Sequence, residues 1–471
     1  MKSAGAMRRG ALALLKAVGR MSSTPLYQKM SARIPRSVKE RARHVLLNVA
    51  AGGRTAIGSP WNESDAEIAE PALPPPPVSP QTMRGSDGRG ANIIGYVRGA
   101  LGLAENVRSF ARALHAKGFP IALVDANVLE AERNVDDSMA LGLDAAARYE
   151  IDVFFVNPDH LDTAIRELKG SVGRYRIGYW FWELESVPQE WLPAIDLVDE
   201  IWVSSQFVKD AFSRVTRKPV TLIPMPVEVD TAQLPVRVAR EGGVFTFLFS
   251  FDFHSYVQRK NPAAVIEAFL KAFPKERHDV QLIIKCTNGG IFRDQYYELM
   301  SEASKDQRIL VSDGFVRRRQ MLELVNRADA YVSLHRSEGF GLGLAESMYL
   351  GKAVIGTGYS GNLEFMTPDN SCLTDFSMIA VKPGDYVHGE GQQWAQANTD
   401  TAAAYMRRLV DEPGYAEQLG ARASEYMHSH HSRERCSDVA IRRLRQIQEE
   451  LDPKAEAGRA GMPMNELDGR A

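Results

Sequence analysis

The run from Tyr331 to Met366 reads YVSLHRSEGFGLGLAESMYLGKAVIGTGYSGNLEFM and decides the fold of this chain. The apolar stretch ADAYVSL (328–334) is typical of a buried strand, and GLAESMYLG (343–351) is typical of a helix. Glu338 follows the strand, and Glu346 comes 346 − 338 = 8 residues later on the helix. The glycine-rich turn between them lets a ligand approach the backbone and leaves amide groups at the helix start free to bind an anion. Function is therefore expected at this turn.

Short apolar runs alternate with amphipathic ones on both sides of this stretch. The expected strands are 91–97, 119–126, 151–158, 175–183, 200–205 and 220–227 in the first half, and 245–251, 280–286, 308–315, 330–336, 353–358 and 371–376 in the second. The expected helices between them include 104–118, 205–215, 261–273, 317–328 and 343–351. Near-continuous apolar strands alternating with helices predict parallel sheets that are covered on both faces.

The length of 471 residues predicts two domains of moderate size. We expect an α/β fold of two facing, doubly wound Rossmann-like domains with a cleft between them, where ligands bind at the carboxyl ends of the strands. The expected domains are residues 91–235 and 236–450, joined through the polar run EVDTAQLPVRVAREGG (228–243). A basic segment with a proline-rich linker (1–90) precedes them, and a disordered tail (451–471) follows.

Composition excludes several classes of function. The net charge is 57 − 59 = −2, which offers no overall positive field for nucleic acid. The three cysteines have no paired spacing, which argues against a disulfide framework or a thiolate metal site and fits the reducing cytoplasm. No His, Cys and Asp cluster has metal-ligand spacing, and His160 and His335 are expected to be packed or exposed rather than catalytic. No apolar run reaches the roughly 18 residues of a membrane span.

The first 54 residues differ from the rest of the chain, with twelve Lys or Arg against one acid, Glu40. Apolar residues are spread among these charges. Two interpretations stay open for this segment. It is either a basic amphipathic segment that lies on anionic lipid at the cytoplasmic face of the inner membrane, or a disordered basic tail.

The run SEGFGLGLAE resembles the glutamate-seven-glutamate signature of retaining glycosyltransferases with the GT-B fold. The longer run is similar to glycosyltransferase family 4, of the glycosyltransferase group 1 type. The likeness covers most of the chain from Ala91 to about Arg445 and includes GYWFWELESVPQEW (178–191), DEIWVSSQFVKDAF (199–212), RKNP (259–262) and GYSGN (358–362). It implies a metal-independent hexosyltransferase that needs no cofactor beyond its nucleotide-sugar donor.

The resemblance also implies roles for the residues of the turn. Glu338 would contact the transferred sugar, and Glu346 would hold the ribose hydroxyls of the nucleotide. The backbone amides of Gly339, Phe340 and Gly341 would line the pocket for the diphosphate and the sugar.

Arg259 and Lys260 precede a predicted helix that Asn261 could cap, with Pro262 in its first turn. Cations at this place could bind a departing nucleotide diphosphate and stabilise its developing charge. Lys260 resembles the phosphate-binding lysine of the family. The family places an arginine some six residues before that lysine, where this chain has His254, and Arg259 is the substitute that we expect.

Lys285 at the end of VQLIIKC is a further candidate for the donor site, although a lysine at the end of a strand is more often exposed.

Two features of the first half are candidates for binding an acceptor. Gly99 and Gly102 lie in the strand-to-helix turn of GYVRGALGLAENVRSF, without the spacing of a dinucleotide fingerprint. The resemblance implies that this turn faces the acceptor and the diphosphate. Glu183 lies beside Trp180 and Trp182, and aromatic rings next to a carboxylate suit a sugar, although aromatic residues in a strand are more often core. Glu183 is the stronger acceptor-binding candidate.

The expected function is transfer of a sugar, which the resemblance suggests is mannose or glucose, from a nucleotide-sugar to a hydroxyl of a glycan or lipid-linked glycan, as in bacterial cell-surface polysaccharide biosynthesis. Three alternatives stay open. A nucleotide-sugar epimerase and a glycan phosphorylase share the architecture, but the phosphorylase would need a cofactor lysine site that we do not find. A nucleotide-sugar-binding protein without turnover is the alternative from another class.

Overall fold

The computed structural model describes residues 89–99, 102–126, 139, 143–144, 146–168, 173–229, 231, 234–235 and 243–452. These residues form two compact units. The N-terminal unit comprises the described residues up to Glu228 together with those from Ser429 onward, and the C-terminal unit comprises Val229–His428. The predicted basic segment and linker lie outside the described residues except for 89–90, and so does the predicted tail after Asp452.

A sheet of six parallel strands forms the centre of the N-terminal unit, in the order β2-β1-β3-β4-β5-β6. The strands are β1 (Ala91–Gly95), β2 (Ile121–Asp125), β3 (Ile151–Phe155), β4 (Tyr175–Tyr179), β5 (Glu200–Val203) and β6 (Val220–Leu222). The helices are α4 (Gly102–Ala116), α5 (Pro158–Glu167), α6 (Leu192–Ile195), α7 (Gln206–Ser213) and α15 (Arg433–Leu451). Strand order reverses between β1 and β3, which makes this the switch point of the sheet.

The C-terminal unit has a second sheet of six parallel strands, in the order β12-β11-β10-β7-β8-β9. The strands are β7 (Phe245–Asp252), β8 (Val280–Thr287), β9 (Ile309–Asp313), β10 (Ala330–Ser333), β11 (Ala353–Thr357) and β12 (Cys372–Thr374). The helices are α8 (Val257–Lys260), α9 (Pro262–Ala272), α10 (Arg293–Ala303), α11 (Arg318–Arg327), α12 (Leu342–Tyr349), α13 (Thr399–Asp411) and α14 (Tyr415–His430), whose last two residues pass into the N-terminal unit. The switch point of this sheet lies between β7 and β10.

Each of the twelve predicted apolar runs forms a strand of one of these two sheets. The prediction succeeds because strands buried on both faces have near-continuous apolar sequences, as β1, β3 and β11 show with every residue buried. The five predicted helices are also present as α4, α7, α9, α11 and α12.

Aromatic residues fill the core of the N-terminal unit. Phe155 and Tyr179 stack with ring centroids 4.6 Å apart, and Phe110 contacts both rings. Trp180 and Trp182 are buried as well, so the interpretation of these two residues as core is confirmed.

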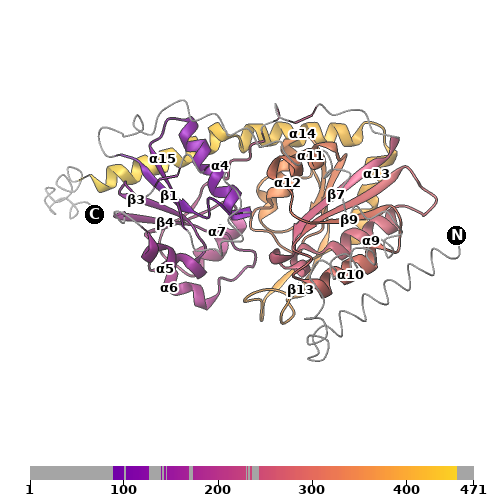
Figure 1. Cartoon of the computed structure of the whole chain (residues 1–471), viewed down its shortest axis with the longest axis horizontal. Helices are drawn as coiled ribbons and strands as arrows, with labels where there is room; N and C mark the ends of the chain where they lie inside the picture. The colour runs from indigo at the N-terminus through magenta and orange to yellow at the C-terminus, as the bar shows by residue number, and fades with distance from the viewer. Residues whose placement is uncertain are drawn as a thin grey trace, which may run out of the picture. The chain divides into compact units, whose positions relative to one another are not determined.

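The chain returns to the N-terminal unit after α14. The sequence-based division assigned all of 236–450 to the second domain, whereas contacts place Ser429 onward in the first unit. The reason is that α15 buries one stripe, which includes Ala440, Leu444 and Ile447, and packs against α4 (Figure 1).

A small antiparallel hairpin was not predicted. It consists of β13 (Phe376–Ala380) and β14 (Gln393–Ala397) and belongs to neither large sheet. None of the helices among the described residues has the length and apolar character that a membrane crossing needs.

Candidate functional site

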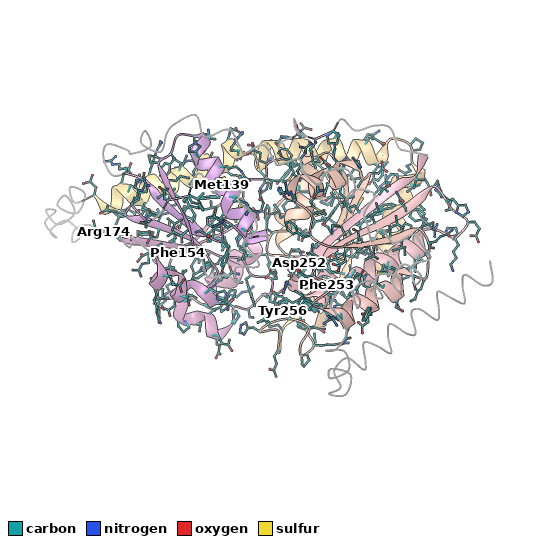
Figure 2. All side chains as sticks on the ribbon, viewed as in Figure 1. Met139, Phe154, Arg174, Asp252, Phe253 and Tyr256 are labelled. Carbon is teal, nitrogen blue, oxygen red and sulfur yellow. The ribbon has the colours of Figure 1, made fainter. Side chains whose placement is uncertain are left out.

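The candidate site lies at the switch point of the C-terminal sheet. β7 ends at Asp252, and the segment after it contains Phe253 and Tyr256 and continues into α8 (Figure 2 labels these three residues). The segment after β10 leads to Glu338. The two segments meet, because the backbone N–H of Arg336 donates to the carbonyl of Arg259 over 2.8 Å. Parallel strands that diverge in this way leave a crevice where ligands bind in sheets of this class.

Glu338 is bound by both predicted cations. Its Oε2 accepts a hydrogen bond from Arg259 Nη1 at 3.0 Å, and its Oε1 accepts one from Lys260 Nζ at 2.5 Å. Arg259 also donates to the carbonyl of Ser337 at 2.9 Å. Glu338 and Arg259 are buried, while the side chain of Lys260 keeps 19% exposure. The sequence placed these three residues in one site, and the structure brings them into direct contact.

Burial by itself would raise the pKa of Glu338, but the charges of Lys260 and Arg259 outweigh it and lower the pKa to about 2. The carboxyl group is therefore ionised at neutral pH. Two cations and one carboxylate leave the cluster with one positive charge in excess, which suits an anionic ligand.

Two residues in unusual backbone conformations flank the short helix α8. Tyr256 has φ 62° and ψ 105°, and Asn261 lies in the left-handed region with φ 54° and ψ 52°. Pro262 begins α9 as predicted, but the prediction that the Asn261 side chain caps this helix is wrong. Its amide nitrogen instead donates to the carbonyl of Leu334 at 2.9 Å, which ties α8 to the segment after β10.

The glycine turn after Glu338 packs against the GYSGN loop. The N–H of Glu338 donates to Ser360 Oγ, and the N–H of Gly361 donates to the Glu338 carbonyl, both at 2.8 Å. A side chain at Gly361 would place its Cβ 2.1 Å from the carbonyl oxygen of Gly339, so this position needs glycine. Gly341 precedes α12 with φ 95°, a conformation that favours glycine.

Phe340 points into the protein. It is buried, and its ring contacts Phe365 with centroids 5.1 Å apart. Only its backbone is therefore available for the predicted role at the diphosphate and sugar pocket.

Glu346 lies buried on α12 and forms an ion pair with Arg318, whose Nη2 is 2.5 Å from Oε1. Arg318 is the first residue of α11 and its side chain is 29% exposed. Sequence reasoning missed Arg318, because in the basic run VRRRQ it resembles an ordinary charged helix start.

Lys285 is buried rather than exposed, and burial lowers the pKa of its ammonium group. The ammonium donates to the carbonyl of Cys286 at 3.1 Å and to that of Gly314, which follows β9. Lys285 therefore binds carbonyl groups at the ends of β8 and β9. Glu338 follows β10, which lies on the other side of β7.

His335 is fully buried beneath the site. Its Nε2 lies 3.0 Å from Asn362 Oδ1 and its Nδ1 lies 3.2 Å from Ser333 Oγ. Burial lowers the pKa of this imidazole. A neutral, packed histidine agrees with the sequence-based expectation. Asn362 and Ser360 are further site residues, and their signal was present in the quoted GYSGN run.

The predicted acceptor turn follows β1, at the switch point of the N-terminal sheet. The Gly99 N–H donates to the carbonyl of Tyr96, and the Gly99 carbonyl accepts a bond from Arg108 Nη1, both at 2.9 Å. Gly102 begins α4, and no atom lies within 4 Å of where its Cβ would be. Arg108 was not anticipated; it is buried and also binds Glu105, so it fixes the shape of the turn.

Glu183 lies half-buried in the segment after β4. The three nearby tryptophans do not form an exposed wall, because Trp180, Trp182 and Trp191 are all buried. His160 is exposed on α5, one of the two placements that were expected for it.

Within the described ranges, no group of three His, Cys, Asp or Glu side chains is placed to hold a metal ion.

One family model matches the region of the chain that contains this candidate site. Residues 249–426 match the family described as Glycosyl transferases group 1. The match contains Arg259, Lys260, Glu338, Glu346 and the turn between the two glutamates. The group 1 match thus lies within the C-terminal unit. No curated protein matches the chain significantly.

Solved structures share the fold over about three quarters of the chain. The Anabaena protein HepE in complex with UDP and glucose is 13% identical, with a TM-score of 0.54, and the match covers 76% of this chain and 100% of that one. Sucrose-phosphate synthase from Thermosynechococcus elongatus is 15% identical, with a TM-score of 0.55 and coverage of 77% and 100%. These likenesses confirm the fold class, two doubly wound α/β domains as in GT-B glycosyltransferases.

Proposed function

We propose that this protein is a retaining glycosyltransferase that moves a sugar from a nucleotide-sugar to a hydroxyl of a glycan or lipid-linked glycan. The observation that carries the proposal is the contact of Arg259 and Lys260 with Glu338 at the switch point, inside the region that matches the group 1 glycosyl transferases. Because HepE has been solved with UDP-glucose, we take glucose on UDP as the first donor to test and mannose as the second sugar.

The leaving group explains the cations. When the sugar departs, negative charge develops on the nucleotide diphosphate, and two fixed cations in a water-poor site stabilise it strongly. Arg259 and Lys260 are held in place beforehand by Glu338, so they need little reorganisation during the reaction. The positive charge that the cluster keeps in excess offsets part of the diphosphate charge, and we propose a transfer that needs no metal and no cofactor.

The two glutamates then have separate tasks. Glu338 contacts the transferred sugar as a carboxylate, since its low pKa keeps it ionised. Glu346 accepts hydrogen bonds from the ribose hydroxyls, with Arg318 holding its other side. In a retaining transfer the acceptor hydroxyl approaches on the face of the leaving group, so a donor phosphate oxygen can take its proton. This route needs no histidine base, which agrees with the buried, neutral His335.

We further propose where the acceptor binds and where in the cell the reaction takes place. The turn at Gly99 and Gly102 and the side chain of Glu183 bind the acceptor. The reaction serves cell-surface polysaccharide synthesis on the cytoplasmic side of the membrane, and the basic segment within residues 1–54 contacts anionic lipid.

A donor assay tests the proposal. Purified protein is incubated with UDP-glucose, GDP-mannose and other nucleotide-sugars, and release of the nucleoside diphosphate is measured with and without glycan acceptors. We expect release from one donor that an acceptor accelerates. Isomerised donor without any acceptor would indicate the epimerase instead, and binding without release would indicate the non-catalytic alternative.

Lys260→Ala is the first variant to compare. We expect a loss of about 2–4 kcal/mol of transition-state stabilisation at saturating donor, because the ammonium group meets the developing charge. Lys275→Ala is the matched control, since Lys275 is an exposed lysine of the same unit. A loss below a few-fold for Lys260→Ala would remove this lysine from the reaction.

A further inference from the structure

The β13–β14 hairpin reaches the cation pair from outside the large sheet. Most of β13 is exposed, with Phe376 at 40% and Met378 at 37% exposure, while Trp394 on β14 is fully buried. The connection between the two strands carries Tyr386, which is 9% exposed. The sequence did not predict this hairpin, and the roles proposed above do not use it.

The ring of Tyr386 contacts both ends of the segment that carries the cations. It packs edge to face against Tyr256, with ring centroids 4.8 Å apart. The guanidinium carbon of Arg259 lies 5.9 Å from the centroid of the Tyr386 ring, a cation–π distance. One side chain of the hairpin therefore packs on the first residue before α8 and on the cation near its end.

Tyr256 is strained and sets the position of both cations. A positive φ of 62° is unfavourable for a large side chain and persists only where surrounding contacts impose it. The carbonyl of Tyr256 accepts the backbone N–H of Arg259 at 3.0 Å and that of Lys260 at 3.1 Å. Tyr386 supplies one contact that holds the Tyr256 ring, and through it the turn on which α8 is built.

The base of the hairpin is attached to the same segment. The Arg336 side chain donates to the carbonyl of Gln258 at 2.8 Å and to Gln396 Oε1 on β14 at 3.0 and 3.1 Å. Its guanidinium lies 5.3 Å from the Trp394 ring centroid, and its carbonyl accepts the Ala395 N–H at 3.0 Å. The hairpin is thus attached at its base to the segment that contains Gln258 and contacts Arg259 of α8 at its tip.

We propose that the β13–β14 hairpin pre-organises the diphosphate-binding cations, and that Tyr386 is a positioning residue that acts through Arg259. The proposal rests on the proposed function, since it takes Arg259 and Lys260 as the groups that meet the diphosphate. Tyr386 itself needs no contact with the donor in this arrangement. Its ring restricts Tyr256 and Arg259, and a smaller side chain would release both.

A double-mutant cycle tests this. The four proteins are wild type, Tyr386→Leu, Arg259→Ala and the double variant, each measured for donor kcat and KM and for UDP binding by calorimetry. We expect Tyr386→Leu to lower kcat and weaken UDP binding about tenfold, and to have a clearly smaller effect when Arg259 is already alanine, because only the path through Tyr256 to Lys260 then remains. Tyr386→Phe keeps the ring and should stay within about twofold of wild type.

Two controls separate positioning from general damage. Met378→Ala alters the exposed face of the same hairpin and should leave kcat and KM unchanged. Thermal unfolding of each variant verifies folding, and Tyr386→Met repeats the cycle if Tyr386→Leu does not fold.

Equal losses from Tyr386→Leu in both Arg259 backgrounds would overturn the proposal, as would a Tyr386→Phe variant as impaired as Tyr386→Leu. Failure of the wild type to use any donor would contradict the proposed function instead. In that case the UDP-binding cycle still decides the role of Tyr386, because it requires no turnover.

Discussion

Glu338 stays ionised although it is buried, because two cations contact it. A buried carboxylate without partners would become protonated at neutral pH, and removing one partner from a buried ion pair is strongly destabilising. The same three groups therefore contribute to folding and prepare a site with an excess positive charge.

The pKa of Glu338 leads to a prediction about acid stability. Its folded pKa of about 2 lies below the usual 4.5, so the group stabilises the fold fully above pH 4.5 and this contribution disappears as the pH falls through 2. The contribution amounts to roughly 3 kcal/mol. We expect the difference in unfolding free energy between wild type and Glu338→Gln to shrink over this window in denaturant titrations.

Exposed Glu298 provides the control, since Glu298→Gln should change stability little at any of these pH values. A difference between wild type and Glu338→Gln that stays constant from pH 5 to pH 2 would show that the cations do not hold this carboxylate.

Glu338→Gln should also lower turnover at neutral pH, because a charged acceptor of hydroxyl hydrogen bonds is lost.

Glu346 gives a prediction about donor binding. Under the proposed ribose role, Glu346→Gln removes a charged acceptor of hydroxyl hydrogen bonds worth roughly 1.5–3 kcal/mol, so UDP binding should weaken by about ten- to hundredfold. Arg318→Gln should weaken UDP binding in the same direction, because Glu346 loses the group that orients it. Calorimetry with UDP measures both, and unchanged affinity in Glu346→Gln would rule out its ribose role.

Individual residues also show where sequence reasoning ends. Sequence reasoning could predict Glu338 and Glu346, because both belong to one strand-turn-helix unit. It could predict Arg259 and Lys260 for the same reason, since they belong to another such unit. The pairing of Glu346 with Arg318 could not, because it depends on how α11 lies against α12. Lys285 was uncertain for the same reason, since its carbonyl partner Gly314 belongs to another strand end.

At the scale of elements, the turn after β10 and the loop after β11 act as one unit. Gly361→Ala should destabilise the protein by about 1–3 kcal/mol or more, since its Cβ would collide with the backbone of Gly339, which cannot move aside cheaply. UDP binding should fall with it, because the same shift displaces Glu338. Gly290→Ala is the control, with no atom within 4 Å of its Cβ. Equal unfolding temperatures for the two variants would contradict the close packing.

The strands were predictable and the hairpin was not, for a physical reason. Buried parallel strands are apolar throughout, and this pattern survives without knowledge of their neighbours. In β13 the exposed side chains Phe376 and Met378 are themselves apolar, so the alternation that reveals a surface strand is missing. Its identity depends on pairing with β14, which lies after a connection of twelve residues (381–392).

At the scale of the whole chain, the return of α15 to the N-terminal unit is the feature that the sequence did not reveal. The apolar stripe of α15 is typical of any amphipathic helix, so it does not predict which element the helix packs against. The structure shows what fixes it. Arg443 on α15 donates from Nη2 to Glu200 Oε2 at 2.8 Å, and Glu200 at the start of β5 is fully buried. The hydrogen bond with Glu200 raises the pKa of Arg443.

The Glu200 site predicts how α15 contributes to stability. Tyr175, Trp202 and Thr221 also donate to Glu200, so its charge is fully paired only when Arg443 is present. Arg443→Met keeps much of the side-chain volume but leaves a buried carboxylate without its cation, and we expect a loss of about 3–5 kcal/mol in the free energy of unfolding. Arg445→Met on the exposed side of the same helix should stay within about 0.5 kcal/mol of wild type. The double variant with Glu200→Gln should recover part of the loss, because the unpaired charge is then gone. Chemical denaturation of the four proteins measures this, and an Arg443→Met variant as stable as Arg445→Met would show that apolar packing alone holds α15 on the N-terminal unit.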